Sequence, residues 1–155
     1  MIGIEFSSLA NRPELKDLVA GWLWSFWGAP GNFNFYRSMT EHCLKDDFPL
    51  VYVAFMDGKP VGTVALLRAD LFSRQDLYPW MADLYVPPEH RGKGIGSALQ
   101  DFVLTEAKRM GFASIYLYTP LNGYYEKKGW EFVCEEMDRD CSTVRIYKKT
   151  IASKR

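Results

Sequence analysis

The sequence predicts an α+β fold with a mixed sheet, and two patterns carry that prediction. The first is a hairpin: the apolar run Leu50–Phe55 is typical of a strand buried on both faces, and Asp57-Gly58 favours a tight turn into a second strand over Val61–Leu67. The second is a strand–helix–strand unit, in which strands over Trp80–Val86 and Ser114–Tyr118 flank an amphipathic helix. A hairpin joins antiparallel strands, whereas a helical crossover joins parallel ones.

The N-terminal segment predicts one strand and two helices. Ile2–Phe6 alternates briefly and indicates a strand. Asn11 is expected to cap the first helix, with Pro13 in its first turn, and the Gly and Pro residues of 28–31 are expected to end it. A second helix is expected over about residues 34–45. The core-facing stripe of the first helix is predicted from helical spacing and consists of Leu15, Leu18, Val19, Trp22 and Phe26.

The C-terminal half predicts a long helix, a short helix and two further strands. From Gly94 to Met110 the apolar residues fall on one helical face, and Gly111 occupies the position that ends such a helix. We expect a short helix over Leu121–Lys127 and strands over Trp130–Glu135 and Thr143–Lys149. Because the sequence shows no internal repeat, low-complexity segment or linker, residues 1–155 are expected to form a single domain.

Composition excludes several classes of function. The 19 basic residues balance 19 acidic ones, so there is no electrostatic reason to expect a nucleic-acid or membrane-surface partner. No stretch approaches the roughly 20 apolar residues of a membrane span, and the N-terminus lacks the pattern of a signal peptide. Cys43, Cys134 and Cys141 have no metal-ligand spacing, so we expect reduced thiols, no metal site and a cytoplasmic protein.

The segment Arg91-Gly-Lys-Gly-Ile-Gly96 is a candidate pyrophosphate loop. It lies between a strand and a helix, so its glycines allow close backbone approach while the helix offers unpaired N–H groups and a positive dipole end. Arg91 and Lys93 add positive charge. The spacing of an ATP-binding P-loop is absent, and a dinucleotide fingerprint counted from Gly92 has Ser97 where its last glycine should stand.

Two longer segments resemble a known family. Asp83–Leu99 resembles motif A of the GNAT family of N-acetyltransferases, and Arg91, Gly94 and Gly96 fit the acetyl-CoA loop of that motif, Arg/Gln-x-x-Gly-x-Gly/Ala. Gly123–Phe132, which contains Tyr-Tyr-Glu-Lys-Lys-Gly-Trp, is similar to the C-terminal motif of the family. The resemblance covers about residues 50–135 specifically, and the order of the predicted elements is that of the family.

The resemblance implies a fold, a reaction and a cofactor site. It implies a mostly antiparallel central sheet, flanked by helices and splayed between strands four and five. It also implies transfer of an acetyl group from acetyl-CoA, as co-substrate, to an amine of a small molecule or peptide by direct attack in a ternary complex. The pantetheine arm is expected to pair with the strand backbone of Leu84, Tyr85 and Val86. The pyrophosphate is expected to bind the loop and the first turn of the helix, formed by Arg91, Gly92, Lys93, Gly94, Ile95, Gly96 and Ser97.

Two residues are expected to move protons. Tyr125 is the tyrosine of the C-terminal motif and, with an ordinary tyrosine pKa of about 10, would stay protonated and could donate to the departing thiolate. Asp83 is the candidate base, acting through a water, but strand alternation sends Ala82 and Asp83 to opposite faces unless a bulge intervenes. An N–H of Leu84 or Tyr85 is the expected oxyanion donor. Reserve candidates for the base are Asp70, Asp76, Glu41 and His42.

Several points remain open in the sequence. Many family members carry an asparagine seven residues before the catalytic tyrosine, and Tyr118 stands there instead. Trp24 and Trp27 could form an aromatic face for the acceptor, although packing on the second helix is favoured. Tyr124, beside the catalytic candidate, is expected to face the core. A non-catalytic acyl-CoA-binding module and a nucleotide-dependent oxidoreductase are the alternative functions, and a homodimer is left open.

Overall fold

The structure, a computed structural model, describes residues 3–151. Within that range the strands are β1 (Glu5–Ser8), β2 (Leu50–Met56), β3 (Lys59–Leu67), β4 (Trp80–Tyr85), β5 (Ser114–Thr119), β6 (Glu131–Met137) and β7 (Thr143–Thr150). They form one sheet in the order β1-β2-β3-β4-β5-β7-β6. The β4–β5 pair is parallel, whereas β1–β2, β2–β3, β5–β7 and β6–β7 are antiparallel. The predicted fold class, a mixed and mostly antiparallel sheet with flanking helices, is confirmed.

The chain folds into two compact units, each built from two segments. The first comprises Met1–Leu66 and Asp83–Val103, and the second comprises Leu67–Ala82 and Leu104–Arg155. Strand β4 therefore contributes to both units. Its first residue, Trp80, pairs with Tyr116 of β5 in the second unit, while its second half, from Asp83, belongs to the first.

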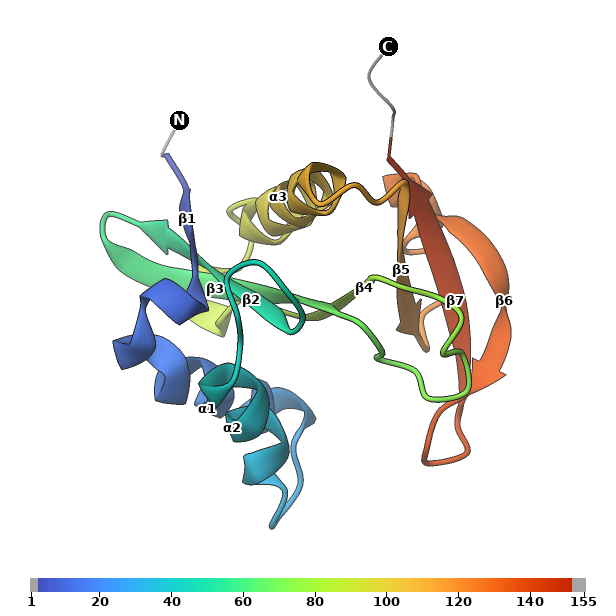
Figure 1. The fold of residues 1–155 in the computed structure, drawn as a ribbon, viewed down its shortest axis with the longest axis horizontal. Helices are drawn as coiled ribbons and strands as arrows, with labels where there is room; N and C mark the ends of the chain where they lie inside the picture. Colours follow the sequence, from blue (N-terminus) through green and yellow to red (C-terminus); the bar gives the residue numbers. More distant parts are fainter. Residues whose placement is uncertain (1–2, 152–155) are drawn as a thin grey trace. The chain divides into compact units, whose positions relative to one another are not determined.

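The first unit is a β-hairpin covered by helices on both faces. Helices α1 (Lys16–Trp27) and α2 (Phe33–Glu41) lie side by side on one face of β2 and β3, and α3 (Ile95–Arg109) lies on the other (Figure 1). The hairpin turns at Asp57 (φ 51°) and Gly58 (φ 76°), and two consecutive left-handed residues are what a tight two-residue turn requires. Leu50–Phe55 is buried throughout, as predicted for a strand covered on both faces.

The entry into α1 differs from the prediction. Two short 3-10 turns, Leu9–Asn11 and Pro13–Leu15, precede the helix, which begins at Lys16 without a side-chain cap. Asn11 therefore ends a turn instead of capping a helix, because the N–H of Arg12 bonds to the carbonyl of Leu9 and closes that turn first. Strand β1 begins three residues later than predicted and ends two residues later, with Ile2 outside the described residues, and α2 ends at Glu41 instead of residue 45.

The buried face of α1 also differs from the predicted stripe. Val19, Ala20 and Leu23 are fully buried, whereas Leu18 is 40% exposed and Phe26 is 59% exposed. Beyond Asp17 the helix carries no charged side chain, so apolar residues surround it and spacing alone does not select one face. The tertiary structure selects the face that contains the small Ala20.

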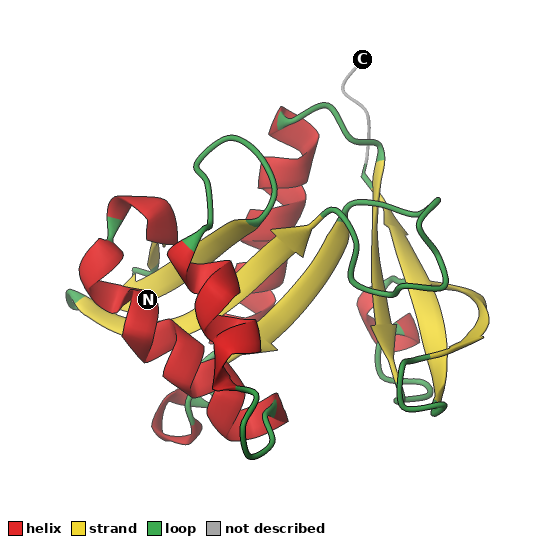
Figure 2. Cartoon of the chain, turned by 60° about the horizontal axis from the view of Figure 1, so that its bottom comes forward, coloured by secondary structure: helices red, strands yellow, loops and turns green. Residues whose placement is uncertain are grey.

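The second unit contains the antiparallel strands β5, β7 and β6 (Figure 2). Its core is formed by Leu71, Trp80, Val144 and Ile146. Helix α3 ends at Arg109, and Gly111 (φ 91°) is the left-handed residue after it, as predicted. The N–H of Gly111 bonds to the carbonyl of Lys108, and the N–H of Phe112 bonds to that of Ala107.

The predicted helix over Leu121–Lys127 is wrong. Only a 3-10 turn, Glu126–Lys128, forms there, because Gly123 is left-handed (φ 88°) and a right-handed helix cannot pass through it. None of the helices between residues 3 and 151 combines the length and apolarity needed to cross a bilayer.

Candidate functional site

The second half of β4 is distorted at Asp83. This residue adopts φ 54°, a left-handed conformation that is uncommon outside glycine and that Asp and Asn tolerate best. A left-handed residue inside a strand breaks the alternation of side chains, which is the condition under which Ala82 and Asp83 need not face opposite sides. Rare backbone conformations of this kind cluster at functional sites.

The carboxyl group of Asp83 has an unusual pKa. Burial raises the pKa of Asp83 to about 6, because the charged form loses hydration. Tyr36 of α2 lies close enough to interact with it: the pKa of Tyr36 is raised by burial and further by the negative charge of Asp83. A carboxylate with a pKa near neutrality is suited to accepting a proton at working pH. Sequence reasoning missed Tyr36, since it belongs to no motif.

Tyr85, two residues further along β4, is the centre of an aromatic cluster. Its buried ring lies 5.8 Å from that of Phe26, 6.1 Å from Trp22 and 6.3 Å from Trp27, measured between centroids. The Arg91 guanidinium lies 5.7 Å from the same ring. The end of α1 is thus fixed against the strand expected to bind the pantetheine arm.

Three aromatic side chains near the end of α1, those of Trp24, Phe26 and Trp27, have different surroundings. Trp24 packs edge-to-face on Phe33 of α2, with centroids 5.9 Å apart, and its Nε1–H donates to the carbonyl of Ala29 at 3.0 Å. The prediction of packing on the second helix is therefore confirmed for Trp24, whereas the ring contacts of Trp27 are with Phe26 and Tyr85. Phe26 and Trp27 remain 59% and 44% exposed while touching each other at 4.7 Å between centroids.

The glycine loop has the geometry of an anion cradle. Gly92 (φ 79°) and Gly94 (φ 80°) are both left-handed, and a Cβ at either position would meet no atom within 4 Å, so the backbone borders open space. The carbonyl of Gly94 accepts the N–H of Ala98 at 3.1 Å, which makes it the first acceptor of α3. The three N–H groups of Ile95, Gly96 and Ser97 precede the first helical donor and are available to a ligand at the positive end of the helix.

The predicted loop and strand residues lie together in the first unit. Arg91 ties the loop to the strand, because its Nε donates to the carbonyl of Val86 at 2.8 Å. Its guanidinium therefore braces the loop in addition to adding charge. The loop and helix terminus together present the donors and the space that a pyrophosphate needs.

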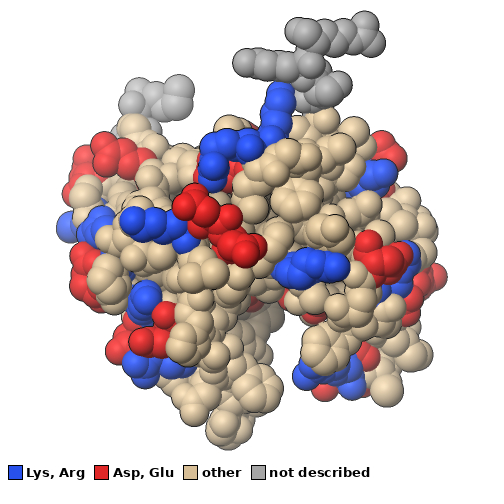
Figure 3. Space-filling view, viewed as in Figure 1, with Lys and Arg blue, Asp and Glu red and all other residues tan. Residues whose placement is uncertain are grey.

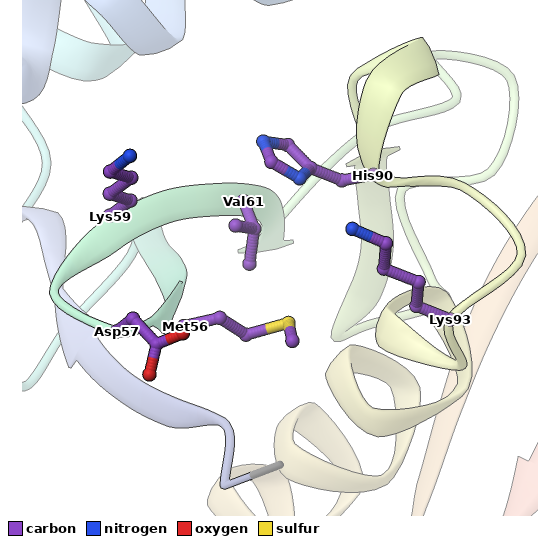
Figure 4. Close-up of a pocket in the computed structure, with 6 residues that line it drawn as sticks. All are labelled: Met56, Asp57, Lys59, Val61, His90 and Lys93. Atoms are coloured by element: carbon purple, nitrogen blue, oxygen red, sulfur yellow. The ribbon is translucent and has the colours of Figure 1, made fainter.

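A basic cavity lies beside the loop (Figure 4). It has a volume of about 210 Å³ and is lined by Met56, Asp57, Lys59, Val61, His90 and Lys93. His90 and Lys93 extend toward Val61 from the loop side, and Lys59 stands on the hairpin side (Figure 4). Lys93 belongs both to this cavity and to the candidate pyrophosphate loop, so the positive charges of the cavity add to the attraction of an anion to the loop.

Tyr125 lies in the second unit and is held by aromatic neighbours. Its ring centroid is 4.9 Å from that of Tyr124, 5.9 Å from Tyr147 and 6.1 Å from Trp130. Burial, and then the neighbouring Tyr124, raises the pKa of Tyr125, so the hydroxyl stays protonated at neutral pH. Its carbonyl accepts the N–H groups of Lys128 and Trp130, both at 3.0 Å.

The surroundings of Tyr125 include a correction and a network that sequence reasoning missed. Tyr124 is 48% exposed, so the expectation that it faces the core is wrong; the two tyrosines lie in a turn, where strand or helix periodicity does not apply. The hydroxyl of Tyr147 donates to Oε2 of Glu126 at 3.0 Å and accepts from Nε of Arg145 at 2.9 Å. This network fixes the turn that carries Tyr125.

Two of the reserve candidates for the base are paired with arginines. Asp76 is held by Arg74 through two contacts of 2.9 Å, and the Arg74 hydrogen bond lowers the pKa of that carboxyl. Glu41 pairs with Arg37 at 3.5 Å. Tyr118, in the place of the family asparagine, packs on Trp80 with centroids 6.1 Å apart. Within the described range, no three His, Cys, Asp or Glu side chains gather as a metal site would require.

Comparison with known proteins decides the family. The model of the Acetyltransferase (GNAT) family matches residues 17–130. This chain belongs to the GNAT acetyltransferase family. No curated protein sequence matches it significantly.

Solved structures of GNAT proteins share the fold. One is an aminoglycoside 6′-N-acetyltransferase complexed with coenzyme A, with a TM-score of 0.74, 18% identity and coverage of 97% of this chain and 99% of that one. The structure of yncA from Salmonella typhimurium with its cofactor acetyl-CoA has a TM-score of 0.68, 14% identity and coverage of 100% and 96%. A ribosomal-protein alanine N-acetyltransferase from Escherichia coli has a TM-score of 0.69, 18% identity and coverage of 98% and 96%. At these identities the likeness establishes the fold.

Proposed function

We propose that this GNAT protein is an N-acetyltransferase that moves the acetyl group of acetyl-CoA onto an amine of a small molecule or peptide. The proposal rests on three features that follow one another along a single segment of the first unit. Asp83, whose pKa burial raises to about 6, directly precedes the candidate pantetheine strand, and the glycine loop follows that strand. A proton acceptor, a strand edge and an anion cradle are the parts that this reaction needs on its cofactor side.

The fit of acetyl-CoA rests on the loop and the strand. The open space at Gly92 and Gly94 and the N–H groups at the start of α3 suit a pyrophosphate. Backbone groups of Leu84, Tyr85 and Val86 are the proposed partners of the pantetheine amides, in the manner of an added strand. Coenzyme A and acetyl-CoA are present in structures of GNAT proteins with the same fold, which supports the same co-substrate here.

In the proposed first step Asp83 accepts a proton from the acceptor amine, through a water. A primary alkyl ammonium resembles that of lysine, with a pKa near 10.4, and must lose this proton before its nitrogen can attack. The neutral nitrogen then adds to the thioester carbonyl carbon, and the N–H of Leu84 or Tyr85 donates to the resulting oxyanion.

In the second step the carbon–sulfur bond breaks and Tyr125 donates its proton to the departing thiolate. The hydroxyl of the half-buried Tyr125 is protonated at neutral pH, which is the state that a proton donor needs. Tyr125 then regains a proton from solvent, the former amine nitrogen loses its second proton to water, and Asp83 releases to solvent the proton that it accepted in the first step. The products are the N-acetylated amine and coenzyme A.

Ligand-dependent melting followed by a thiol-release assay tests the proposal. Acetyl-CoA at a hundredfold excess over its Kd should stabilise the protein by roughly 2.7 kcal/mol, and NAD and ATP should not. Release of the coenzyme A thiol on addition of an amine should then follow. No stabilisation by millimolar acetyl-CoA would refute the proposal, and stabilisation without thiol release for any amine would favour the non-catalytic acyl-CoA-binding module.

A further inference from the structure

The chain between Asp17 and Arg37 contains no charged side chain. It holds seven aromatic residues: Trp22, Trp24, Phe26, Trp27, Phe33, Phe35 and Tyr36. This segment forms most of α1, all of the α1–α2 loop and the start of α2. In the space-filling view the loop end of these two helices shows neither blue nor red atoms (Figure 3). An exposed segment of two helices and their loop without a charged side chain is unusual, because exposed faces normally carry Lys, Arg, Asp or Glu.

Part of this aromatic surface is fixed against the candidate catalytic strand. Phe26 and Trp27 pack on Tyr85, two residues after Asp83, and are 59% and 44% exposed. Tyr36 of α2 also interacts with the charge of Asp83. The exposed rings of α1 and the start of α2 therefore adjoin the proposed proton acceptor within one unit of the fold.

We propose that the acceptor is a monoamine on an aromatic or apolar body, an arylalkylamine in its simplest form. This inference rests on the proposed N-acetyltransferase function. The ring of the acceptor packs on Phe26 and Trp27, which contribute apolar area and ring faces. Its ammonium is attracted to the same ring faces and transfers its proton to Asp83.

The same surface disfavours polycationic acceptors. An aminoglycoside or polyamine carries several ammonium groups, and each group that leaves water needs a carboxylate or another polar partner. The segment from residue 18 to 36 offers no carboxylate. The aminoglycoside acetyltransferases with the same fold therefore do not predict the acceptor of this chain. The lack of counter-charges is itself a specificity element.

Steady-state kinetics with three acceptors tests the inference. With acetyl-CoA saturating, kcat/KM for phenethylamine should exceed that for kanamycin and for spermine by about tenfold or more. Phe26→Ala and Trp27→Ala should each lower kcat/KM for phenethylamine by about 2- to 30-fold, mainly through KM, because they remove ring contacts to the bound acceptor. The Kd of acetyl-CoA should change less than the KM for phenethylamine, because Phe26 and Trp27 contact the ring of Tyr85 whereas its proposed pantetheine contacts are backbone groups. Phe72→Ala is the matched control, since Phe72 is 62% exposed in the second unit and should have no effect.

A variant that adds a negative charge to the aromatic surface should shift the preference toward polycationic acceptors. Phe26→Glu should lower kcat/KM for phenethylamine and raise it for spermine, because it supplies one carboxylate to the acceptor surface. A wild-type preference for kanamycin or spermine would overturn the inference and leave the acetyltransferase function intact. Unchanged amine kinetics in Phe26→Ala, with a shift from dimer to monomer in gel filtration, would overturn it in favour of an interface between two copies. Acetyl-CoA binding without turnover of any amine would instead refute the proposed function, and the inference with it.

Discussion

Replacing Asp83 by Asn separates the catalytic role of this residue from its cost to stability. Asn keeps the size of the side chain and removes its charge. Asn also tolerates the left-handed backbone (φ 54°) as well as Asp does, so the strand is expected to keep its path. The difference between the two proteins then reports the ionisation of one carboxyl group.

The magnitude follows from the raised pKa. Burial moves the pKa of Asp83 from its ordinary 3.8 to about 6, and each pKa unit corresponds to about 1.36 kcal/mol. The full shift corresponds to a loss of roughly 3 kcal/mol in the free energy of unfolding when Asp83 is ionised. Because Asp83 is only half-buried, water reduces this loss, and we expect about 1–3 kcal/mol.

Ionisation of Asp83 destabilises the folded protein as the pH rises. Between about pH 4 and pH 6 the folded protein keeps this proton while the unfolded chain releases it, so the wild-type free energy of unfolding falls as the pH rises. Asp83→Asn removes this dependence. The variant should therefore be more stable than wild type by about 1–3 kcal/mol above pH 6, and nearly equal to it at pH 4.

Urea unfolding at pH 4, 5, 6 and 8 measures the difference, and thiol release measures the activity of the same variant. If Asp83 is the base, kcat/KM should fall by about 10²- to 10⁴-fold while stability rises. Asp57→Asn is the matched control, because Asp57 is also left-handed (φ 51°) but lies exposed in the hairpin turn. This variant tests whether Asn is tolerated in a left-handed conformation, and it should fold as stably as wild type at pH 8. A stability difference for Asp83→Asn that is the same at all four pH values would refute the burial argument, and normal activity would refute the role as base.

Two further predictions concern the other proposed site elements. Tyr125→Phe should lower turnover by about 10²- to 10⁴-fold with little change in acetyl-CoA affinity, whereas Tyr124→Phe, on an exposed ring, should be near neutral; a loss confined to Tyr124→Phe would mean that the neighbouring tyrosine is the proton donor. Gly94→Ala should lower the free energy of unfolding by about 1–2 kcal/mol because φ is 80° there, while Gly96→Ala, whose Cβ would lie 4.0 Å from Val86, should fold at least as stably as wild type by urea titration. Equal stability of the two glycine variants would contradict the left-handed geometry of the loop.

Local patterns in the sequence were sufficient wherever one short segment sets its own conformation. The unbroken apolar run of β2 implied burial on both faces, and Asp57-Gly58 implied a turn of two left-handed residues. Gly111 ended α3 because glycine adopts the left-handed conformation without steric cost. The glycine loop was located by its place between a strand and a helix, and the GNAT family by two motifs in order along the chain.

Local patterns failed where the outcome depends on distant neighbours. The segment over residues 121–127 has apolar residues at helical spacing, yet Gly123 forms a turn in the structure. The first helix is apolar on all sides, so the choice of Val19, Ala20 and Leu23 as its buried face depended on the shape of the sheet on which it packs. Tyr124 and Tyr125 are chemically identical neighbours, and the packing of Trp130 and Tyr147 on Tyr125 distinguishes the half-buried ring from the exposed one.

For Asp83, too, the sequence determines one part of the site and the tertiary structure another. The sequence by itself placed an aspartate at the start of the candidate pantetheine strand, within a family motif. It could not give the left-handed φ, the pKa of about 6 or the approach of Tyr36. The raised pKa arises from burial, and Tyr36 belongs to α2, a helix more than forty residues away in the chain. Hydration and electrostatic interaction depend on distance in space, which only the tertiary structure decides.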